Sequence, residues 1–458
     1  MSVFTGEQIK MTDDYQGGDM HSGGGVETVS NADCNRIVLI SLRDPFMDSD
    51  RVMPPLGVMS LHSFMQSCGY ESVIENDFDV DSIEKYQNFS HFGISCMTPQ
   101  RNQAYEILNA IRANFPGKVV VLGGPHVKYY QEECEGKEFD YLVVGDGELA
   151  LKAIMENTPG LSRVVQMPVS ESQMNDFPIP YRDQAFLNQY DYRFLGIKAT
   201  TVLTAKGCPM SCTFCEDART TVRHYFPDVV EQQIIQIKSM GYEGIMFFDD
   251  IFTISIKRVR ELAGVIRKHN IKFRCFGHAK RMTDEMCTLL ADAGCVETGF
   301  GAESGSQKIL DITRKRTTVQ ANMDYIERCN RHGIRVKAFL MLGLPGENLQ
   351  TIAETREFLE FLMSQRFKSR LGMEISNDFD MTIFFPYKGT AIRNSLDEGT
   401  NEYDLFFVGN AADYAGFYKG KCGSSDTILR TSALTQEELV HHQRELLDTF
   451  KKQVIQGV

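Results

Sequence analysis

The first part of the chain alternates short apolar runs with amphipathic stretches, a pattern typical of parallel α/β sheets. Continuous apolar runs predict strands that are covered on both faces, and 3.6-residue spacing predicts helices over Gly57–Cys68 and Ala104–Ala113. The predicted strands are Ile37–Ile40, Ser72–Glu75, Phe92–Met97, Val119–Leu122 and Tyr141–Val144. Repeated strand–loop–helix units of this kind predict a Rossmann-like, doubly wound parallel sheet.

A second alternating series runs from about residue 198 to residue 390. Its predicted strands are Thr201–Ala205, Gly244–Phe248, Lys272–Phe276, Val296–Gly301, Val336–Leu342 and Met381–Phe385. Helices are predicted between them over Val229–Ser239, Lys257–His269, Thr283–Ala293, Val319–Arg331 and Ile352–Met363. Six such units predict a partial (β/α)6 barrel that is open on one side.

The remaining segments divide the chain into five parts. Residues 1–33 are glycine-rich and polar, and we expect a disordered tail. The first sheet occupies residues 34–166, and residues 167–197, with three prolines, form a linker before the barrel of residues 198–390. Residues 391–458 form a mixed carboxyl-terminal region, in which a helix over Gln436–Val454 packs back on the body.

Composition fits a globular, cytoplasmic protein. The 458 residues are 42% hydrophobic and 24% charged, within the range of folded domains. The net charge of −13 opposes binding to nucleic acids and anionic membrane surfaces. We find no signal-like apolar segment near the start and no apolar run of about 20 residues, the length of a membrane span. Twelve cysteines without secretory signals predict a reducing compartment.

Three cysteines, Cys208, Cys212 and Cys215, directly follow the first predicted strand of the barrel. A loop at this place opens onto the face where barrel enzymes carry their active sites. Three thiolates on one loop can ligate three irons of a four-iron, four-sulfur cluster and leave the fourth iron free, since fully ligated clusters take four cysteines. A zinc site needs a fourth ligand at matching spacing, and His224 fits that spacing poorly.

This spacing, with Phe214 before the last cysteine, resembles the signature of the radical S-adenosylmethionine (SAM) enzymes. Three further segments resemble later motifs of that superfamily, in order and at the ends of predicted strands: Phe247–Thr253, Gly299–Gly305 and Phe339–Glu347. The resemblance covers about residues 199 to 386. It implies a [4Fe-4S] cluster on the three cysteines and SAM as a cofactor.

The same resemblance implies residues that bind SAM. The free iron would chelate its amino and carboxylate groups, and the backbone of Phe214 would lie by the adenine. Asp249 and Asp250 would accept hydrogen bonds from an amine or hydroxyl, unless they form a solvated turn. Glu303 and Ser304 would hold the ribose or the amino acid part, although Glu303 also fits a carboxylate at a helix start.

Two further positions carry open alternatives. Lys337 lies in the middle of an apolar strand, where it either pairs with a carboxylate inside the barrel or faces an edge. Gly343, together with Gly346, either allows close approach of backbone to the adenosyl group or forms a plain tight turn. The catalytic side chains are not identified by the sequence.

The amino-terminal sheet resembles the cobalamin-binding domain that precedes the barrel in many radical SAM enzymes. Pro54–Gly57, Gly123–Val127 and Asp140–Glu148 carry the resemblance, which covers about residues 36 to 157. Glycines there remove side chains where a bulky corrinoid tail lies against backbone. The implied binding positions are Leu56, Gly57, Ser95, Thr98, Gly123, Gly124, Pro125, His126, Gly145, Asp146, Gly147 and Glu148. His126 also fits a structural histidine, and residues 43–56 contain no histidine that could ligate cobalt.

Together the two resemblances predict a cobalamin-dependent radical SAM methyltransferase. We expect it to methylate an unactivated carbon or a phosphinate of a small molecule, as a monomer or homodimer that takes electrons from a flavodoxin or ferredoxin. Ring contraction or oxidative cyclisation without methyl transfer is the main alternative. More distant alternatives are a tRNA-modifying radical SAM enzyme, which would place a second cluster on amino-terminal cysteines, and a non-catalytic cobalamin-binding module.

Overall fold

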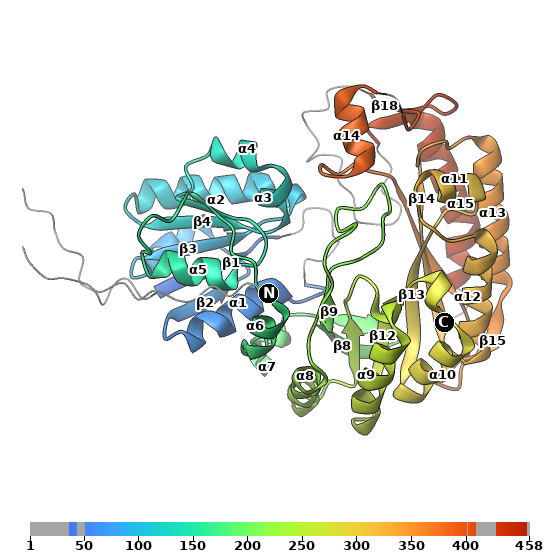
Figure 1. Ribbon diagram of the computed structural model, residues 1–458, viewed down its shortest axis with the longest axis horizontal. Helices are drawn as coiled ribbons and strands as arrows, with labels where there is room; N and C mark the ends of the chain where they lie inside the picture. The colour runs from blue at the N-terminus through green and yellow to red at the C-terminus, as the bar shows by residue number, and fades with distance from the viewer. Residues whose placement is uncertain (1–35, 44–50, 401, 409–426, 456–458) are drawn as a thin grey trace, which may run out of the picture.

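Two α/β sheets lie side by side in the computed structural model, which describes residues 36–43, 51–400, 402–408 and 427–455 (Figure 1). The first sheet is entirely parallel, with strand order β2-β1-β3-β4-β5-β6. Its strands are β1 (Arg36–Ser41), β2 (Glu71–Glu75), β3 (His91–Ser95), β4 (Val119–Gly123), β5 (Tyr141–Val143) and β6 (Val164–Val165). The five predicted strands are confirmed, and the two-residue β6 was not predicted.

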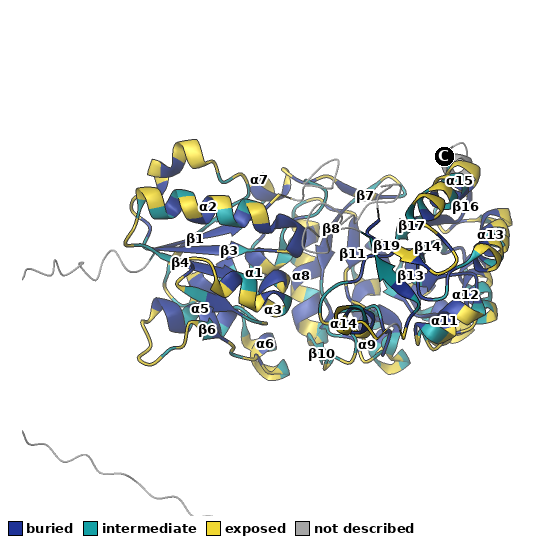
Figure 2. Ribbon diagram, turned by 90° about the horizontal axis from the view of Figure 1, so that it is seen from above, coloured by how far each residue is buried: buried dark blue, intermediate teal, exposed yellow. Residues whose placement is uncertain are grey.

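Helices cover both faces of this sheet, as a doubly wound fold requires (Figure 2). On one face, helix α2 (Arg101–Asn114) packs on Val38, Phe92 and Val120. On the other face, helices α1 (Leu56–Ser67) and α5 (Glu148–Met155) pack on the alternate strand residues, including Ile37 and Val121. The shorter helical segments are α3 (Pro125–Tyr129), α4 (Gln131–Glu135) and the 3-10 turns Val80–Tyr86 and Thr98–Gln100.

The second sheet curls into a half-barrel, with strand order β17-β14-β13-β12-β11-β8-β7. Its strands are β7 (Tyr192–Phe194), β8 (Ile197–Val202), β11 (Gly244–Phe247), β12 (Lys272–Gly277), β13 (Cys295–Glu303), β14 (Arg335–Leu342) and β17 (Asp378–Ile383). The six predicted parallel strands are all present. β8 lies a few residues before its predicted position, and β7, from the predicted linker, adds an antiparallel edge.

The barrel helices cover the outer face of this sheet. They are α8 (Pro227–Ser239), α9 (Ile256–Lys268), α10 (Asp284–Ala293), α11 (Gln307–Ile312), α12 (Val319–Arg331) and α13 (Leu349–Ser364), with 3-10 turns over Phe252–Ile254 and Ala279–Arg281. In β14, Val336, Ala338, Leu340 and Leu342 are buried against these helices. The alternate residues are only partly buried and face the inside of the half-barrel, because successive strand side chains point to opposite faces.

Shorter elements connect and close the two halves. Helices α6 (Glu171–Asp176) and α7 (Gln184–Leu187) lie in the predicted linker, and strands β9 (Ala205–Lys206) and β10 (Arg223–His224) form a hairpin. The other small elements are the hairpins β15–β16 (Arg366–Lys368, Glu374–Ser376) and β18–β19 (Leu405–Phe407, Leu429–Thr431), and helix α14 (Ala391–Glu398). Gln443 of α15 (Gln436–Ile455) donates to the Met381 carbonyl, so the last helix packs on the body as predicted.

The predicted disordered tail of residues 1–33 falls outside the described residues. Among the helices that the structure describes, none combines the length and the apolar character that a membrane span requires.

Candidate active site

A cavity of about 240 Å³ opens at the carboxyl ends of the strands of the first sheet. Many of the predicted cobalamin positions line it: Gly57, Ser95, Gly123, Gly124, Pro125, Gly145, Asp146, Gly147 and Glu148. A Cβ added at Gly57 or Gly145 would meet no atom within 4 Å, so open space lies in front of both backbones. A wall of bare backbone fits a large ligand that lies flat against it, which is what the tail of a corrinoid would need.

The turn after β4 depends on glycine for a different reason. Gly124 has a φ of +95°, and a Cβ there would lie 2.6 Å from the Cys96 carbonyl oxygen. The backbones of two adjacent turns therefore touch, and the Cys96 carbonyl accepts a hydrogen bond from the His126 amide. Any side chain at this position would push the two turns apart and change the shape of the cavity rim.

His126, Thr98 and Leu56 lie away from this cavity's lining. The His126 ring is buried, with Nε2 3.1 Å from the Tyr105 hydroxyl and Nδ1 3.4 Å from Thr98 Oγ1. Burial, partly offset by Glu133, lowers the pKa of His126 to about 4. The structural interpretation of this histidine is therefore the better supported one. Leu56 lines a separate small pocket near Tyr225.

The three cysteines lie on the loop between β9 and β10, close to the open end of the half-barrel. The loop is held by its own backbone, because Thr220 donates to the Cys208 carbonyl and Arg219 donates to the Met210 carbonyl. Burial raises the pKa of all three thiols, that of Cys215 to about 12. Thiolates at these positions therefore need nearby positive charge, which a bound iron cluster would supply. All ten cysteines that the structure describes are free thiols.

A buried ion pair lies beside these cysteines. Lys315 Nζ is 2.6 Å from Glu303 Oε1, and it lies over the ring of Phe214 at 5.9 Å. A Cβ at Gly301 would be 2.0 Å from the Glu303 carboxylate, so this glycine makes the space for the pair. Burial opposes the charge of Lys315, but Glu303 and Cys212 outweigh it and raise the pKa of the amine. Lys315 was not predicted, although the run Arg314-Lys315-Arg316 is a visible basic signal in an acidic chain.

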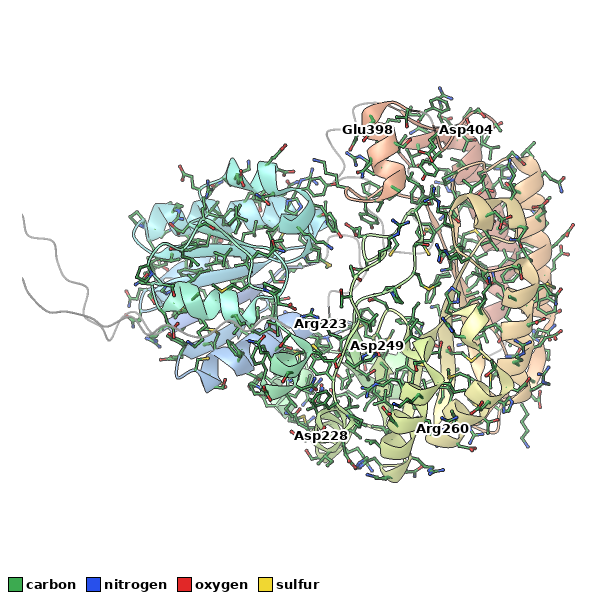
Figure 3. The ribbon with its side chains drawn as sticks, viewed as in Figure 1. Arg223, Asp228, Asp249, Arg260, Glu398 and Asp404 are labelled. Carbon is green, nitrogen blue, oxygen red and sulfur yellow. The ribbon has the colours of Figure 1, made fainter. Side chains whose placement is uncertain are left out.

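The two predicted aspartates have different surroundings. Asp249 is buried and accepts hydrogen bonds from the amides of Thr204 and Ala205, at 2.6 and 3.1 Å, and from the Thr204 hydroxyl. Burial outweighs these bonds and raises the pKa of Asp249 to about 6. Its carboxylate thus holds the segment that leads into the cysteine loop (Figure 3). Asp250 is exposed and lies close enough to Cys208 to raise the pKa of that thiol.

Ser304 and Gly343 are also held by internal contacts. Ser304 Oγ is 3.1 Å from Thr355 Oγ1 and accepts a hydrogen bond from the Ser306 amide. Gly343 has a φ of +80°, and its amide donates to the buried carboxylate of Glu347 at 3.3 Å. Burial raises the pKa of Glu347 to about 7. These contacts favour the tight-turn interpretation of Gly343.

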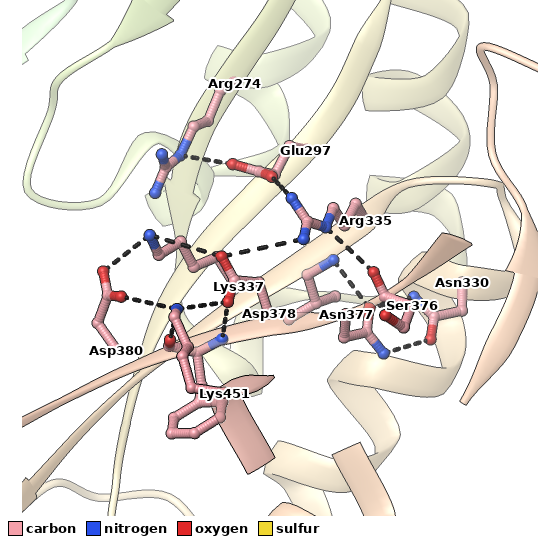
Figure 4. Close-up of polar contacts among 12 residues, drawn as sticks. Arg274, Glu297, Asn330, Arg335, Lys337, Ser376, Asn377, Asp378, Asp380 and Lys451 are labelled. Atoms are coloured by element: carbon pink, nitrogen blue, oxygen red, sulfur yellow. Dashed lines mark hydrogen bonds and ion pairs between the residues drawn. The ribbon is translucent and has the colours of Figure 1, made fainter. Parts of the chain in front are cut away.

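Lys337 pairs with carboxylates on the inner face of the half-barrel, which decides between its two alternatives. Its amine lies 2.8 Å from Asp380 and 3.7 Å from Asp378 (Figure 4). Lys451 of α15 lies 2.6 Å from the same Asp378. The network continues across the strands through Arg335, Glu297 and Arg274. This layer of charges fixes β12, β13, β14 and β17 relative to one another.

Three phenylalanines line the inner face next to this charged layer. The ring centroids of Phe248 and Phe276 are 5.8 Å apart, and those of Phe276 and Phe339 are also 5.8 Å apart. Gly299 leaves room for this row, because a Cβ there would lie 2.8 Å from the Phe276 ring and 2.9 Å from the Phe339 ring. Phe248 is 46% exposed, a large value for a phenylalanine on a concave face.

Two protein families match separate parts of the chain. Residues 48–155 match the B12 binding domain, and residues 202–359 match the Radical SAM superfamily. The first range contains most of the cavity lining, and the second contains the three cysteines and the Glu303–Lys315 pair. The fold class predicted from the sequence and the cofactor set of [4Fe-4S] cluster, SAM and cobalamin are thereby confirmed.

Curated relatives cover most of the chain at low identity. An uncharacterized methyltransferase of Pyrococcus horikoshii is 26% identical over 380 residues, which are 75% of this chain and 79% of the relative. Bacteriochlorophyllide d C-8(2)-methyltransferase of Chlorobaculum tepidum is 24% identical over 77% of this chain and 78% of its own length. The anaerobic magnesium-protoporphyrin IX monomethyl ester cyclase of Rubrivivax gelatinosus is 25% identical over 66% of this chain and 61% of its own length.

Solved structures share the fold. The cobalamin-dependent SAM radical enzyme OxsB, with aqua-cobalamin and SAM bound, aligns at a TM-score of 0.73 and 15% identity, over 91% of this chain and 67% of that chain. In a second OxsB structure, with aqua-cobalamin bound, the aligned part is 74% of this chain but only 54% of that chain, at a TM-score of 0.63 and 18% identity. The radical SAM methyltransferase TsrM of Kitasatospora setae aligns at 0.64 and 17% identity, over 83% of this chain and 81% of that chain.

Proposed function

We propose that this chain, a radical SAM enzyme with a B12-binding domain ahead of its barrel, is a methyltransferase that modifies an unactivated carbon or a phosphinate of a small molecule. The observation that carries the proposal is the direct contact between the corrinoid cavity and the cysteine loop. Arg223, at the end of that loop, lies 2.6 Å from Asp146 of the cavity wall. Two relatives that align with about three quarters of this chain are named as methyltransferases, which supports methyl transfer as the reaction.

The residues of the chain would hold each cofactor in a distinct way. When bound, the cluster with SAM supplies a substrate radical, and the corrinoid supplies a methyl group. Cys208, Cys212 and Cys215 bind the cluster, and the buried Lys315 balances the thiolate charge next to it. The glycine turns of the first sheet hold the corrinoid tail against backbone. Asp249 keeps the start of the cysteine loop in place.

We infer that the substrate lies on the inner face of the half-barrel, over the row of Phe248, Phe276 and Phe339. The exposed ring of Phe248 on a concave face favours a ligand with a flat apolar part. A ligand that covers this ring would exclude water from a reactive intermediate. The charged layer of Lys337 and Asp380 lies beside this row and offers contacts to a polar group of the substrate.

The proposal also concerns the source of electrons and the compartment. Radical SAM chemistry needs an external reductant, and we propose a flavodoxin or ferredoxin in the cytoplasm. The free state of the ten described cysteines supports a reducing environment.

The test uses the anaerobically reconstituted full chain with hydroxocobalamin, a reductant, and metabolite extracts from cells that lack the gene. We expect a product that gains one methylene and carries deuterium from methyl-deuterated SAM. Phe248→Ser should raise KM for that substrate and leave the iron and corrinoid content unchanged. The control Phe226→Ser alters an exposed phenylalanine elsewhere, and it should leave KM, iron content and corrinoid content unchanged.

Oxidative cyclisation is a second candidate, because a magnesium-protoporphyrin ester cyclase is among the relatives. The same assay separates the two reactions. A product that has lost hydrogens and gained no carbon from SAM would identify the reaction as cyclisation and would contradict methyl transfer.

A further inference from the structure

The loop that carries the three cysteines is held at its base by one carboxylate of the corrinoid domain. Strands β9 and β10 pair there, with Lys206 opposite Arg223. Arg223 contacts both oxygens of Asp146, at 2.6 and 3.1 Å, and Lys206 Nζ lies 3.5 Å from Asp146. Both strands that begin and end the cysteine loop are thus attached to a single side chain of the other domain.

Asp146 also belongs to the wall of the corrinoid cavity. It lies between Gly145, which has a φ of +88°, and Gly147, whose Cβ position is 3.0 Å from Leu61. Asp146 and Lys206 both line the cavity, so the barrel half contributes a residue to the corrinoid site. Burial alone would raise the pKa of Asp146, but the hydrogen bond from Arg223 and the charge of Lys206 outweigh it and lower that pKa. The carboxylate is therefore charged when it holds the two cations.

The segment between the domains supports the same hairpin. The Val169 amide donates to Asp146 at 3.2 Å. Glu171, at the start of α6, accepts a hydrogen bond from the His224 amide at 2.8 Å. Arg223 and His224 of β10 are therefore fixed from the corrinoid turn on one side and from the linker on the other.

A second contact joins the corrinoid domain to the far part of the cysteine loop. The hydroxyl of Tyr129 donates to the Glu216 carbonyl at 2.8 Å, one residue after Cys215. Tyr129 ends helix α3, which begins at Pro125 of the glycine turn after β4. A Cβ at Gly389 would lie 2.4 Å from the Tyr129 ring, so the segment that follows β17 packs closely against this ring. Each of two corrinoid turns thus leads directly to a contact with the cysteine loop.

We propose that Asp146 and Tyr129 couple the two metal-cofactor sites, so that the corrinoid and the iron cluster bind with positive cooperativity. A corrinoid that packs on the turns of Gly124 and Gly145 restricts Tyr129 and Asp146 to these positions, and both residues contact the loop on which the cluster binds. The second cofactor to bind then meets a loop whose conformational entropy is already reduced. This coupling rests on the confirmed cofactor set and holds whatever the substrate is.

The test measures the affinity of the full chain for hydroxocobalamin by equilibrium ultrafiltration, under anaerobic conditions. One sample has its cluster reconstituted with iron and sulfide, and the other is stripped of iron by a chelator. We expect the cluster-loaded protein to bind hydroxocobalamin about 5-fold tighter or more, the lower range of typical coupling between sites. By reciprocity, saturating hydroxocobalamin should raise the chelator concentration that removes half of the iron.

Variants assign the coupling to the two contacts. Each of the variants Arg223→Gln and Tyr129→Phe should lower the affinity ratio toward one, and Arg223→Gln should lower it more, because Tyr129→Phe removes only a hydroxyl. Arg260→Gln is the matched control, because Arg260 forms an exposed ion pair with Glu285 on barrel helices, and its ratio should equal that of the unaltered chain. If Arg223→Gln does not fold, Arg223→Lys and Tyr129→Phe carry the test. A ratio of one in the unaltered chain, or an unchanged ratio in the folded variants, would overturn the proposal.

Discussion

The two proposed ligand-binding edges of this protein are built in opposite ways. At the carboxyl edge of the first sheet, bare glycine backbone faces a cavity, and Gly57 and Gly145 have open space in front of them. At the edge of the half-barrel, the motif side chains are already engaged: Asp249 with backbone amides and Glu303 with Lys315. Gly57 and Gly145 therefore leave room for a ligand, whereas Asp249 and Glu303 support the loops that would hold one.

This difference changes what a substitution does. At Gly57 of the first edge, adding a side chain should displace the ligand and leave the fold intact. At the second edge, removing a side chain should loosen a loop, and the ligand is lost as a consequence. The following experiments rank these effects from the largest to the smallest.

The largest effect is expected at the cysteine loop. Cys212→Ala removes one of the three proposed iron ligands, and we expect the reconstituted protein to lose nearly all cluster iron and all formation of 5′-deoxyadenosine. Iron and sulfide content and product analysis measure this. Cys68→Ala, at a half-buried cysteine outside the loop, is the control and should keep its iron. Full iron content in Cys212→Ala would exclude this loop as the cluster site.

A smaller but specific effect is expected at the corrinoid cavity. Gly57→Leu places a side chain in open space, so we expect the affinity for hydroxocobalamin to fall about 10-fold or more, equivalent to about 1.4 kcal/mol, with little change in Tm. Equilibrium ultrafiltration and thermal unfolding measure both quantities. Gly264→Leu in helix α9, where a Cβ also meets nothing within 4 Å, should leave the affinity unchanged. Equal affinity in both variants would mean that this cavity does not bind the corrinoid.

The buried carboxyl of Glu347 should make stability depend on pH. Its pKa is raised to about 7 by burial, above its unfolded value, so its contribution to stability is complete at low pH. That contribution is lost as the pH rises through about 7. Between about pH 5 and pH 8, the free energy of unfolding should fall by about 1 to 3 kcal/mol less in Glu347→Gln than in the unaltered chain.

Denaturant unfolding at several pH values measures the effect of Glu347→Gln. Glu360→Gln, at an exposed position of α13, should leave the slope unchanged. An identical pH dependence in the unaltered chain and Glu347→Gln would show that the turn of Gly343 does not depend on this carboxyl.

The smallest effect on corrinoid binding is expected at His126. Its two ring nitrogens contact Tyr105 and Thr98 beneath the cavity rim, so His126→Gln should lower Tm by removing buried hydrogen bonds. The absorbance spectrum and the affinity of bound hydroxocobalamin should stay the same. A changed corrinoid spectrum in this variant would make His126 a cobalt ligand and would contradict its structural role.

Much of the fold follows from local sequence. Apolar runs such as Ile37–Ile40 predict buried parallel strands, because only strands covered on both faces lack polar alternation. The order of strand–helix units then restricts the topology to a doubly wound sheet and a half-barrel. The short strands β7 and β9 could not be predicted from the sequence, because they are only three and two residues long and carry no periodic signal.

Local residue patterns are enough to predict which cofactors this protein uses. The spacing of Cys208, Cys212 and Cys215 and the glycine turns are local features, and their chemistry does not depend on distant residues. The side chains that these residues contact are visible only in the folded chain. Asp146 lies 77 residues from Arg223 in the chain, and Glu303 reaches Lys315 only because Gly301 leaves space for the pair. Pairing between side chains depends on how the two sheets and their loops come together, and no local pattern records that.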